Sequence, residues 1–188
     1  MLSKIINNIH WIDVLIIGMT IRIIYIGLTN GFVIELFKLL GILAAAFISF
    51  HYYSGLAKFL HEHIAIPESV LNIICFALLI FLVLWLSKFI SEGISVVLKV
   101  NAHPLLDKWG ALVIAMIRSL FVSSVVLVVA SLSGFNYLKE SARESLLNPY
   151  LIDLSPQFYK SCMNGFVIKF FSKEKINPVI LKLEREAL

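Results

Sequence analysis

The 188-residue chain is 60% apolar and only 15% charged, and its mean hydropathy is +0.92. Soluble domains carry about 25% charged residues, so the composition excludes an ordinary soluble protein and indicates an integral membrane protein. The formal net charge is +4, and half of the 16 Lys and Arg follow Ser133. This basic balance favours the lipid bilayer, with an anionic membrane surface, as the partner and not nucleic acid.

The first apolar run, at about residues 11–28, is long enough to cross a hydrocarbon core of about 30 Å, because a helix rises about 1.5 Å per residue. It carries one strong cation, Arg22, and ends at a turn signal that contains Asn30 and Gly31. Asp13 and Arg22 interrupt the run and no small-residue cleavage site follows, so we predict an uncleaved first span.

The second run, at about 32–53, carries Glu35 and Lys38 near its start. Helical spacing places these two side chains on one face. Farther along, Gly41 and residues 44–46 form a stretch of small residues where another helix can approach closely. Such a face fits packing within the chain, a homo-oligomer or a partner membrane protein.

The third run, at about 70–90, has no charge before Lys88 and is the clearest span. The connection before it, residues 54–69, is polar and predicts a solvent loop or a short surface helix. After it, apolar residues recur at helical spacing over 91–103, up to Pro104. This segment predicts an amphipathic surface or re-entrant helix that leads into the last span.

The fourth run, at about 110–133, is preceded by a polar segment that we call the gate, from Asp107 to Gly110. Arg118 follows eight residues after Gly110, which a rise of about 1.5 Å per residue places roughly 12 Å deep. A cation at that depth costs at least about 2.5–3.5 kcal/mol on insertion scales. The fold must therefore supply Arg118 with a partner, with water or with a function.

The composition changes after residue 135, which predicts a transmembrane domain at 1–135 and, at 136–188, a polar linker with an amphipathic C-terminal tail. The tail carries an apolar stripe of two adjacent rows with a period of four residues: Phe158, Cys162, Phe166 and Phe170, with Tyr159, Met163, Val167 and Phe171 beside them. A helix lying in the membrane interface explains this stripe, and so does a helix packed on the bundle or on another subunit. Together, the elements predict an all-α membrane protein with a four-span transmembrane helical bundle.

Four spans place both termini and residues 54–69 on one side, which we call side A, and the turn at Gly31 and the gate on the other, side B. Four charged residues then lie roughly 6 to 12 Å below side B: Arg22, Glu35, Lys38 and Arg118. Since one anion faces three cations, this layer indicates a bound anion or water access. The alternative is a structural network, in which Glu35 pairs with Arg22 and Lys38 reaches the surface.

The sequence contains no metalloprotease, serine-hydrolase, P-loop or dinucleotide-binding motif. His51, His61 and His63 surround one surface loop without an accompanying acidic pattern, so we expect no metal there. Cys75 and Cys162 lack metal-ligand spacing and are expected to be free thiols. The sequence therefore predicts neither an enzyme nor a bound cofactor.

Three short segments carry a family resemblance: Trp11-Ile12-Asp13, Asn30-Gly31-Phe32 followed by Glu35 and Leu36, and Asp107-Lys108-Trp109-Gly110-Ala111 leading to Arg118. In this order the segments resemble the colicin V production protein family (CvpA) over about residues 11–166. The chain departs from the family pattern at three positions. Asn30 replaces a basic residue before the turn glycine, and Ala115 and Ser119 replace glycines that would allow close helix packing.

The resemblance implies a multi-pass protein of the bacterial inner membrane, with a role in colicin V production or export and in cell-envelope homeostasis. Two other functions remain open from the residues, each using the layer of Arg22, Lys38 and Arg118: a small channel or transporter, and a protein that binds anionic lipid. A scaffold for a partner protein is a further alternative. Basic residues near the spans number four on side A and three on side B, so the positive-inside rule does not orient the chain.

Overall fold

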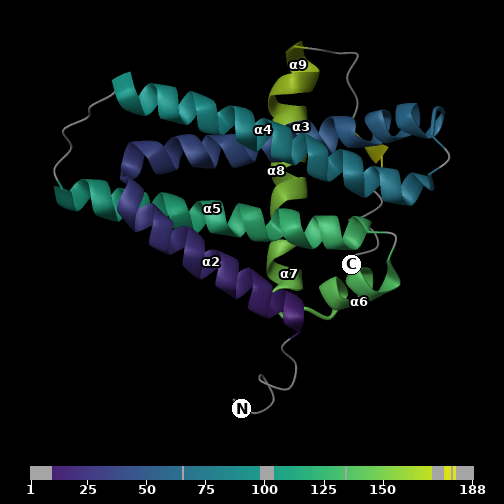
Figure 1. The fold of residues 1–188 in the computed structure, drawn as a ribbon, viewed down its shortest axis with the longest axis horizontal. Coiled ribbons are helices and arrows are strands. Elements are labelled where there is room, and N and C mark those ends of the chain that lie inside the picture. Colours follow the sequence, from purple (N-terminus) through teal and green to yellow (C-terminus); the bar gives the residue numbers. More distant parts are fainter. Residues whose placement is uncertain are drawn as a thin grey trace.

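The computed structural model describes residues 10–64, 66–97, 104–133, 135–170, 176–178 and 180. Within these residues the fold is helical and contains no strand (Figure 1). Four long helices form one layer: α2 (Trp11–Asn30), α3 (Phe32–His61), α4 (Glu68–Val97) and α5 (Pro104–Leu132). Each contains a segment that is long and apolar enough to cross a membrane, which confirms the predicted four-span, all-α class.

These helices carry apolar side chains on their exposed surfaces as well as on the surfaces where they pack against one another. On α4, Phe81 is 71% exposed and Trp85 is 55% exposed. In water such a surface would favour aggregation, whereas in hydrocarbon it is the expected surface of a spanning helix, whose backbone polar groups are already paired internally. The exposed apolar residues therefore agree with a membrane location.

Two of the helices continue past the predicted ends of their spans. α3 runs to His61, so the connection predicted at 54–69 begins only after that residue. α4 runs to Val97, so the helix predicted separately at 91–103 is, over 91–97, a continuation of the third span; residues 98–103 lie outside the described part. Pro67 lies in the connection between α3 and α4, and the next proline, Pro104, begins α5, where its missing N–H removes no helical hydrogen bond.

The helices are ordered α4, α3, α5, α2 across the layer (Figure 1). α3 packs on both α4 and α5, while α2 packs mainly on α5. Glycines mark the closest approaches: a Cβ added at Gly41 of α3 would lie 2.9 Å from the Cβ of Ser87 in α4. Small residues of this kind let two backbones approach within a membrane, where packing drives helix association.

The C-terminal segment runs across this layer instead of along it (Figure 1). It consists of short helices: α6 (Asn136–Arg143), α7 (Asn148–Leu151), α8 (Leu154–Cys162), the π-helical turn η1 (Met163–Val167) and α9 (Ile168–Phe170). Tyr159 and Met163 are fully buried in one core with Phe50 of α3, Phe76 of α4 and Val125 of α5. Residues on both sides of the predicted boundary at 135 therefore share a core.

Of the two adjacent rows in the predicted apolar stripe, the row that contains Tyr159 and Met163 is the buried one. Tyr159 and Met163 face the bundle, whereas Phe166 is 67% exposed. A buried tyrosine hydroxyl needs hydrogen-bond partners, and here two are within reach: His51 Nδ1 lies 3.0 Å from Tyr159 Oη, and the Asn177 backbone N–H donates to the same oxygen at 3.2 Å. Polar partners on α3 and near the end of the tail thus satisfy the hydroxyl on the side of the helix that is buried.

The tail is also held at the start of the first span. The buried Asp13 carboxylate accepts a hydrogen bond from the Ser145 hydroxyl at 2.5 Å and from the backbone N–H groups of Leu146 and Leu147, each at 3.3 Å. Trp11 Nε1 donates to Ser141 Oγ at 3.1 Å. The first span and the segment after α5 are therefore joined on side A.

Candidate functional site: a charged cluster beside a cavity near side B

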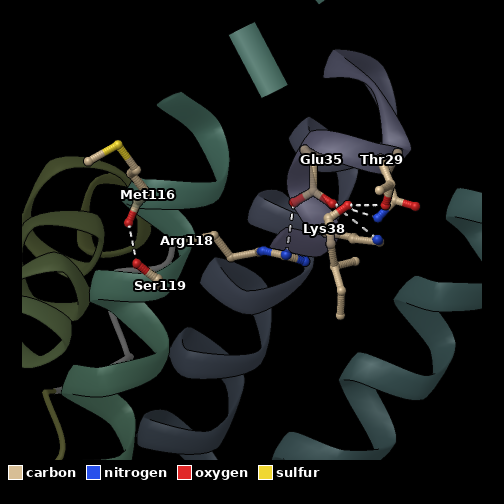
Figure 2. Close-up of polar contacts among 8 residues, drawn as sticks. Thr29, Glu35, Lys38, Met116, Arg118 and Ser119 are labelled. Atoms are coloured by element: carbon tan, nitrogen blue, oxygen red, sulfur yellow. Dashed lines mark hydrogen bonds and ion pairs between the residues drawn. The ribbon is translucent and has the colours of Figure 1, made fainter. Parts of the chain in front are cut away.

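Glu35 lies in the first turn of α3, with its side chain fully buried where α2, α3 and α5 meet (Figure 2). Three polar groups reach its carboxylate. Lys38 Nζ and Asn30 Nδ2 donate to Oε1 at 3.1 Å and 3.0 Å, and Arg118 Nη2 lies 2.9 Å from Oε2. A single carboxylate thus holds two cations and the amide of the preceding turn.

Arg118 is only partly satisfied by this arrangement. Its side chain is 12% exposed and extends from α5 toward Glu35 (Figure 2). This contact is an ion pair without hydrogen-bond geometry, so Glu35 Oε2 lacks a hydrogen-bond partner among the described residues. Arg118 Nε, which is also buried, lacks one as well. A buried donor left unpaired costs about 1–3 kcal/mol, so a group that accepted from Arg118 would be stabilising.

A cavity of about 510 Å³ adjoins this cluster and is lined by all four long helices. Its polar lining is dominated by cations and neutral groups: Asn30, Lys38, Ser87, Lys88, Ser91 and Arg118. No carboxylate is among the described lining residues, and the Lys38 side chain, at 32% exposure, leaves the cluster accessible from outside the protein. The cavity is therefore suited to an anionic group.

Toward side A, the same helices are tightly packed. Ile42 and Val122 line the cavity, and Ala46 of α3 and Val125 of α5, one turn farther along, belong to the large buried core. That core includes Tyr159 and Met163 of the tail. The described residues therefore form a vestibule near side B that ends on a packed core.

The structure places Arg22 outside the cluster. Its side chain is exposed on α2, and among the described residues neither a hydrogen bond nor an ion pair joins it to Glu35. α2 contacts α5 through Gly27, and a rotation of about 100° per residue turns Arg22, five positions earlier, by roughly 140° away from that face. The predicted pairing of Glu35 with Arg22 is therefore wrong, and Glu35 contacts Lys38 and Arg118 instead.

The predicted layer was assigned from depth below side B alone. This criterion included Arg22 and omitted Lys88, Ser87 and Ser91. Lys88, Ser87 and Ser91 lie near the end of the third span, and in the sequence they mark only the polar boundary of that span. They line the cavity because α4 packs along α3. Helical spacing was the available signal, since Leu84, Ser87, Lys88 and Ser91 recur at intervals of three or four on one face.

The gate is a cap that joins two helices. Asp107 Oδ1 accepts a hydrogen bond from the backbone N–H of Phe32 at 2.8 Å, so α5 supplies the cap for the N-terminus of α3. Gly31 has φ of 80°, and a Cβ there would lie 2.7 Å from Asp107 Oδ2. A Cβ at Gly110 would lie 2.6 Å from the Phe32 ring. Gly31, Asp107 and Gly110 therefore form an interlocking contact, while Asn30 belongs to the Glu35 cluster.

Replacing Asp107 with alanine should lower the free energy of unfolding by about 0.5–2 kcal/mol, because the Phe32 N–H at the start of α3 would lose its acceptor and the helix dipole would lose a nearby negative charge. Asp107→Asn keeps an acceptor oxygen and should lose less. Thermal unfolding of the detergent-solubilised variants measures the difference. Equal losses for the two variants would contradict the capping role.

The residues that depart from the family pattern pack closely despite their side chains. A Cβ at Gly27 of α2 would overlap the Cβ of Ala115 in α5. Ser119 turns its hydroxyl to the Met116 carbonyl of its own helix at 2.7 Å (Figure 2). The small residue that lets α2 and α5 approach closely at Ala115 is thus Gly27 of α2.

The three histidines are engaged in separate local contacts. His61 Nδ1 lies 2.8 Å from the Ile66 carbonyl, His63 Nδ1 lies 2.9 Å from the Phe59 carbonyl, and His51 contacts Tyr159. In the part of the chain that the structure describes, no three of His, Cys, Asp and Glu gather as metal ligands. Cys75 and Cys162 are free thiols.

The fold and the cluster define a four-span helical membrane protein with a charged vestibule near one end. A family model described as colicin V production protein matches residues 12–156, which is most of the chain. The chain therefore belongs to the colicin V production protein family. Comparisons with curated proteins and with solved structures gave no match.

Proposed function

We propose that this protein is a non-enzymatic, multi-pass protein of the bacterial inner membrane that supports colicin V production or export and cell-envelope homeostasis. In this proposal it acts by binding an anionic group in the vestibule near side B. The family description supports the biological role. The geometry supports the molecular one through a single observation, namely that Lys38 and Arg118 share one carboxylate and both line the cavity.

The charges of the cluster do not balance. Glu35 supplies one negative charge to the two cations that contact it, Lys38 and Arg118. Within a membrane, charges interact more strongly than in water because the surrounding dielectric is low, so an uncompensated cation is costly. A bound carboxylate or phosphate would supply the second negative charge and would accept hydrogen bonds from the guanidinium.

Binding accounts for the arrangement better than conduction. A path for ions would have to continue toward side A, yet beyond Ile42 and Val122 the helices meet in the core around Phe50 and Tyr159. The side chains of that core are closely packed, and the described cavity does not continue through it, so it lacks the water-lined path that conduction requires. The vestibule is therefore assigned to a ligand that enters and leaves near side B.

Arg118→Leu tests this function. The variant should accumulate normally in the membrane, because it removes a costly buried cation while Glu35 keeps Lys38 and Asn30 as partners. It should fail to restore bile-salt resistance and colicin V secretion in a deletion strain. Arg22→Leu is the matched control, since Arg22 is an exposed arginine outside the cavity, and should restore both.

A fully functional Arg118→Leu protein would reject the binding proposal. If Arg118→Leu were to reduce abundance, Lys38→Gln would provide the second test, because Lys38 is part-exposed and its loss leaves Glu35 paired with Arg118. A solute flux into reconstituted vesicles that depends on Arg118 would replace binding with transport.

A further inference from the structure

The cavity is flanked by the two outer helices of the layer. α2 packs mainly on α5, and α4 packs mainly on α3 (Figure 1). The lining nevertheless includes Ile23 of α2 and Leu84 of α4, together with residues of α3 and α5. The cavity therefore lies against α3 and α5, and α2 and α4 form its side walls. Because α2 and α4 do not pack on each other, the space between them stays open.

The described C-terminal helices cross the layer without lining the cavity. They pack against α3, where Tyr159 lies against Phe47 and Phe50, and against α5 as far toward side B as Phe121, whose ring lies against Phe158. Residues of these helices are absent from the described lining of the cavity. Among the described residues, nothing from the tail covers the side between α2 and α4, so in a membrane that side faces lipid.

Most polar and apolar lining residues are separated by depth, with Ile34 of α3, one turn nearer side B than Lys38, as the exception. On three helices, a cation lines the cavity and an apolar residue four positions away lines it one turn deeper: Lys38 with Ile42, Lys88 with Leu84, and Arg118 with Val122. One turn corresponds to about 5.4 Å along the helix. α4 runs antiparallel to α3 and α5, so the deeper residue has the lower number on α4 and the higher number on the other two.

This gradient matches the orientation of a lipid in the side-B leaflet, whose charged headgroup lies near the surface and whose chains point to the midplane. A soluble anion would use the cations but would gain nothing from Ile42, Leu84 and Val122. A chain laid along them would remove apolar surface from contact with any water in the vestibule. The volume of about 510 Å³ lies in the range of small-molecule pockets, so it accommodates a headgroup and part of a chain.

We propose that the ligand is an anionic phospholipid of the side-B leaflet, which enters between α2 and α4. Its phosphate contacts Arg118, Lys38 and Lys88, and one acyl chain lies along Ile42 and Val122. Glu35 is a positioning residue that holds two of the cations toward the cavity. This assignment depends on the proposed anion-binding function and names the ligand class for that same site.

The test compares three probes on the purified full-length protein in detergent, by native mass spectrometry and by displacement of a fluorescent phosphatidylglycerol. Phosphatidylglycerol carries the anionic head and the chains, glycerol phosphate carries the head alone, and phosphatidylcholine carries chains under a zwitterionic head. We expect phosphatidylglycerol to bind at least about tenfold more tightly than either of the other two, because losing one charge-assisted contact changes affinity by about that factor.

Variants separate the head from the chain. Arg118→Leu should weaken phosphatidylglycerol binding by about tenfold or more. Val122→Asn should weaken phosphatidylglycerol binding while leaving the weaker glycerol phosphate binding unchanged. Arg22→Leu, at an exposed arginine outside the cavity, is the matched control for lipids that only surround the protein and should have no effect.

Each result decides between the two proposals. Glycerol phosphate binding as tight as that of phosphatidylglycerol would overturn the lipid assignment and leave the anion-binding function intact. Equal retention of phosphatidylglycerol by the wild type and Arg118→Leu would also overturn it, since the lipid would then be held elsewhere. Failure of both anionic probes to bind would reject the proposed function together with the lipid.

Discussion

Glu35→Leu should sharply reduce the amount of protein that accumulates in the membrane. The substitution removes the carboxylate that contacts Lys38 and Arg118 and that accepts from Asn30. Breaking a buried ion pair by removing one partner costs about 3–5 kcal/mol, because the remaining charge stays buried without compensation. This is the largest destabilisation that we expect from a single substitution in the chain. Quantitative immunoblotting of membrane fractions measures it.

Two further variants isolate the cause. Glu62→Leu makes the same change at an exposed position just after α3 and should leave abundance unchanged. Adding Arg118→Leu to Glu35→Leu removes the more deeply buried of the two cations and should restore part of the lost protein. Normal accumulation of the single Glu35→Leu variant would show that the cluster does not stabilise the fold.

Gly27→Ala should destabilise the bundle by about 1–3 kcal/mol, the usual cost of overpacking a close contact. The added Cβ would overlap that of Ala115 and would lie 3.7 Å from Cδ of Glu35. α2 and α5 would have to separate at the level of the charged cluster. Thermal unfolding in detergent, followed by the loss of the monodisperse peak in size-exclusion chromatography, measures the effect.

Gly18→Ala is the matched control on the same helix. A Cβ at Gly18 meets nothing within 4 Å, so alanine should be neutral or stabilising through its higher helix propensity, worth up to about 1 kcal/mol. Ala115→Gly should rescue Gly27→Ala, because it removes the atom with which the new methyl collides. If Gly18→Ala and Gly27→Ala behaved alike, the close approach of α2 and α5 at this point would be refuted.

The two halves of the layer differ in a way that bears on how the protein works. Near side A, the tail contributes Tyr159 and Asn177 to a packed, hydrogen-bonded region; the Asn177 amide donates to the Phe50 carbonyl at 2.8 Å and to Ser54 Oγ at 2.9 Å. Near side B, a buried guanidinium borders an open vestibule. A closely packed half near side A thus adjoins a half near side B that contains the cavity and the charged cluster.

Membrane class, helical fold and the approximate spans follow from the sequence alone. In hydrocarbon, the backbone N–H and C=O groups of a chain must be hydrogen-bonded within the protein. Apolar runs of sufficient length therefore specify helices regardless of how those helices pack. The same reasoning placed Glu35, Lys38 and Arg118 at one level, because depth depends only on the rise per residue. Even the order of the motif segments was sufficient to indicate the family.

Only the tertiary structure decided which of those residues meet. Helix rotation and the order of neighbours in the layer turn Arg22 outward and bring Lys88 to the cavity, and neither property is encoded in depth. The contact of Asp107 with Phe32 joins residues 75 positions apart. Tertiary contacts likewise decided which row of the tail's apolar stripe is buried, because the Tyr159 hydroxyl finds its partners in His51 and Asn177. An apolar stripe indicates that a helix packs on a partner, but it does not show where the polar groups of that partner lie.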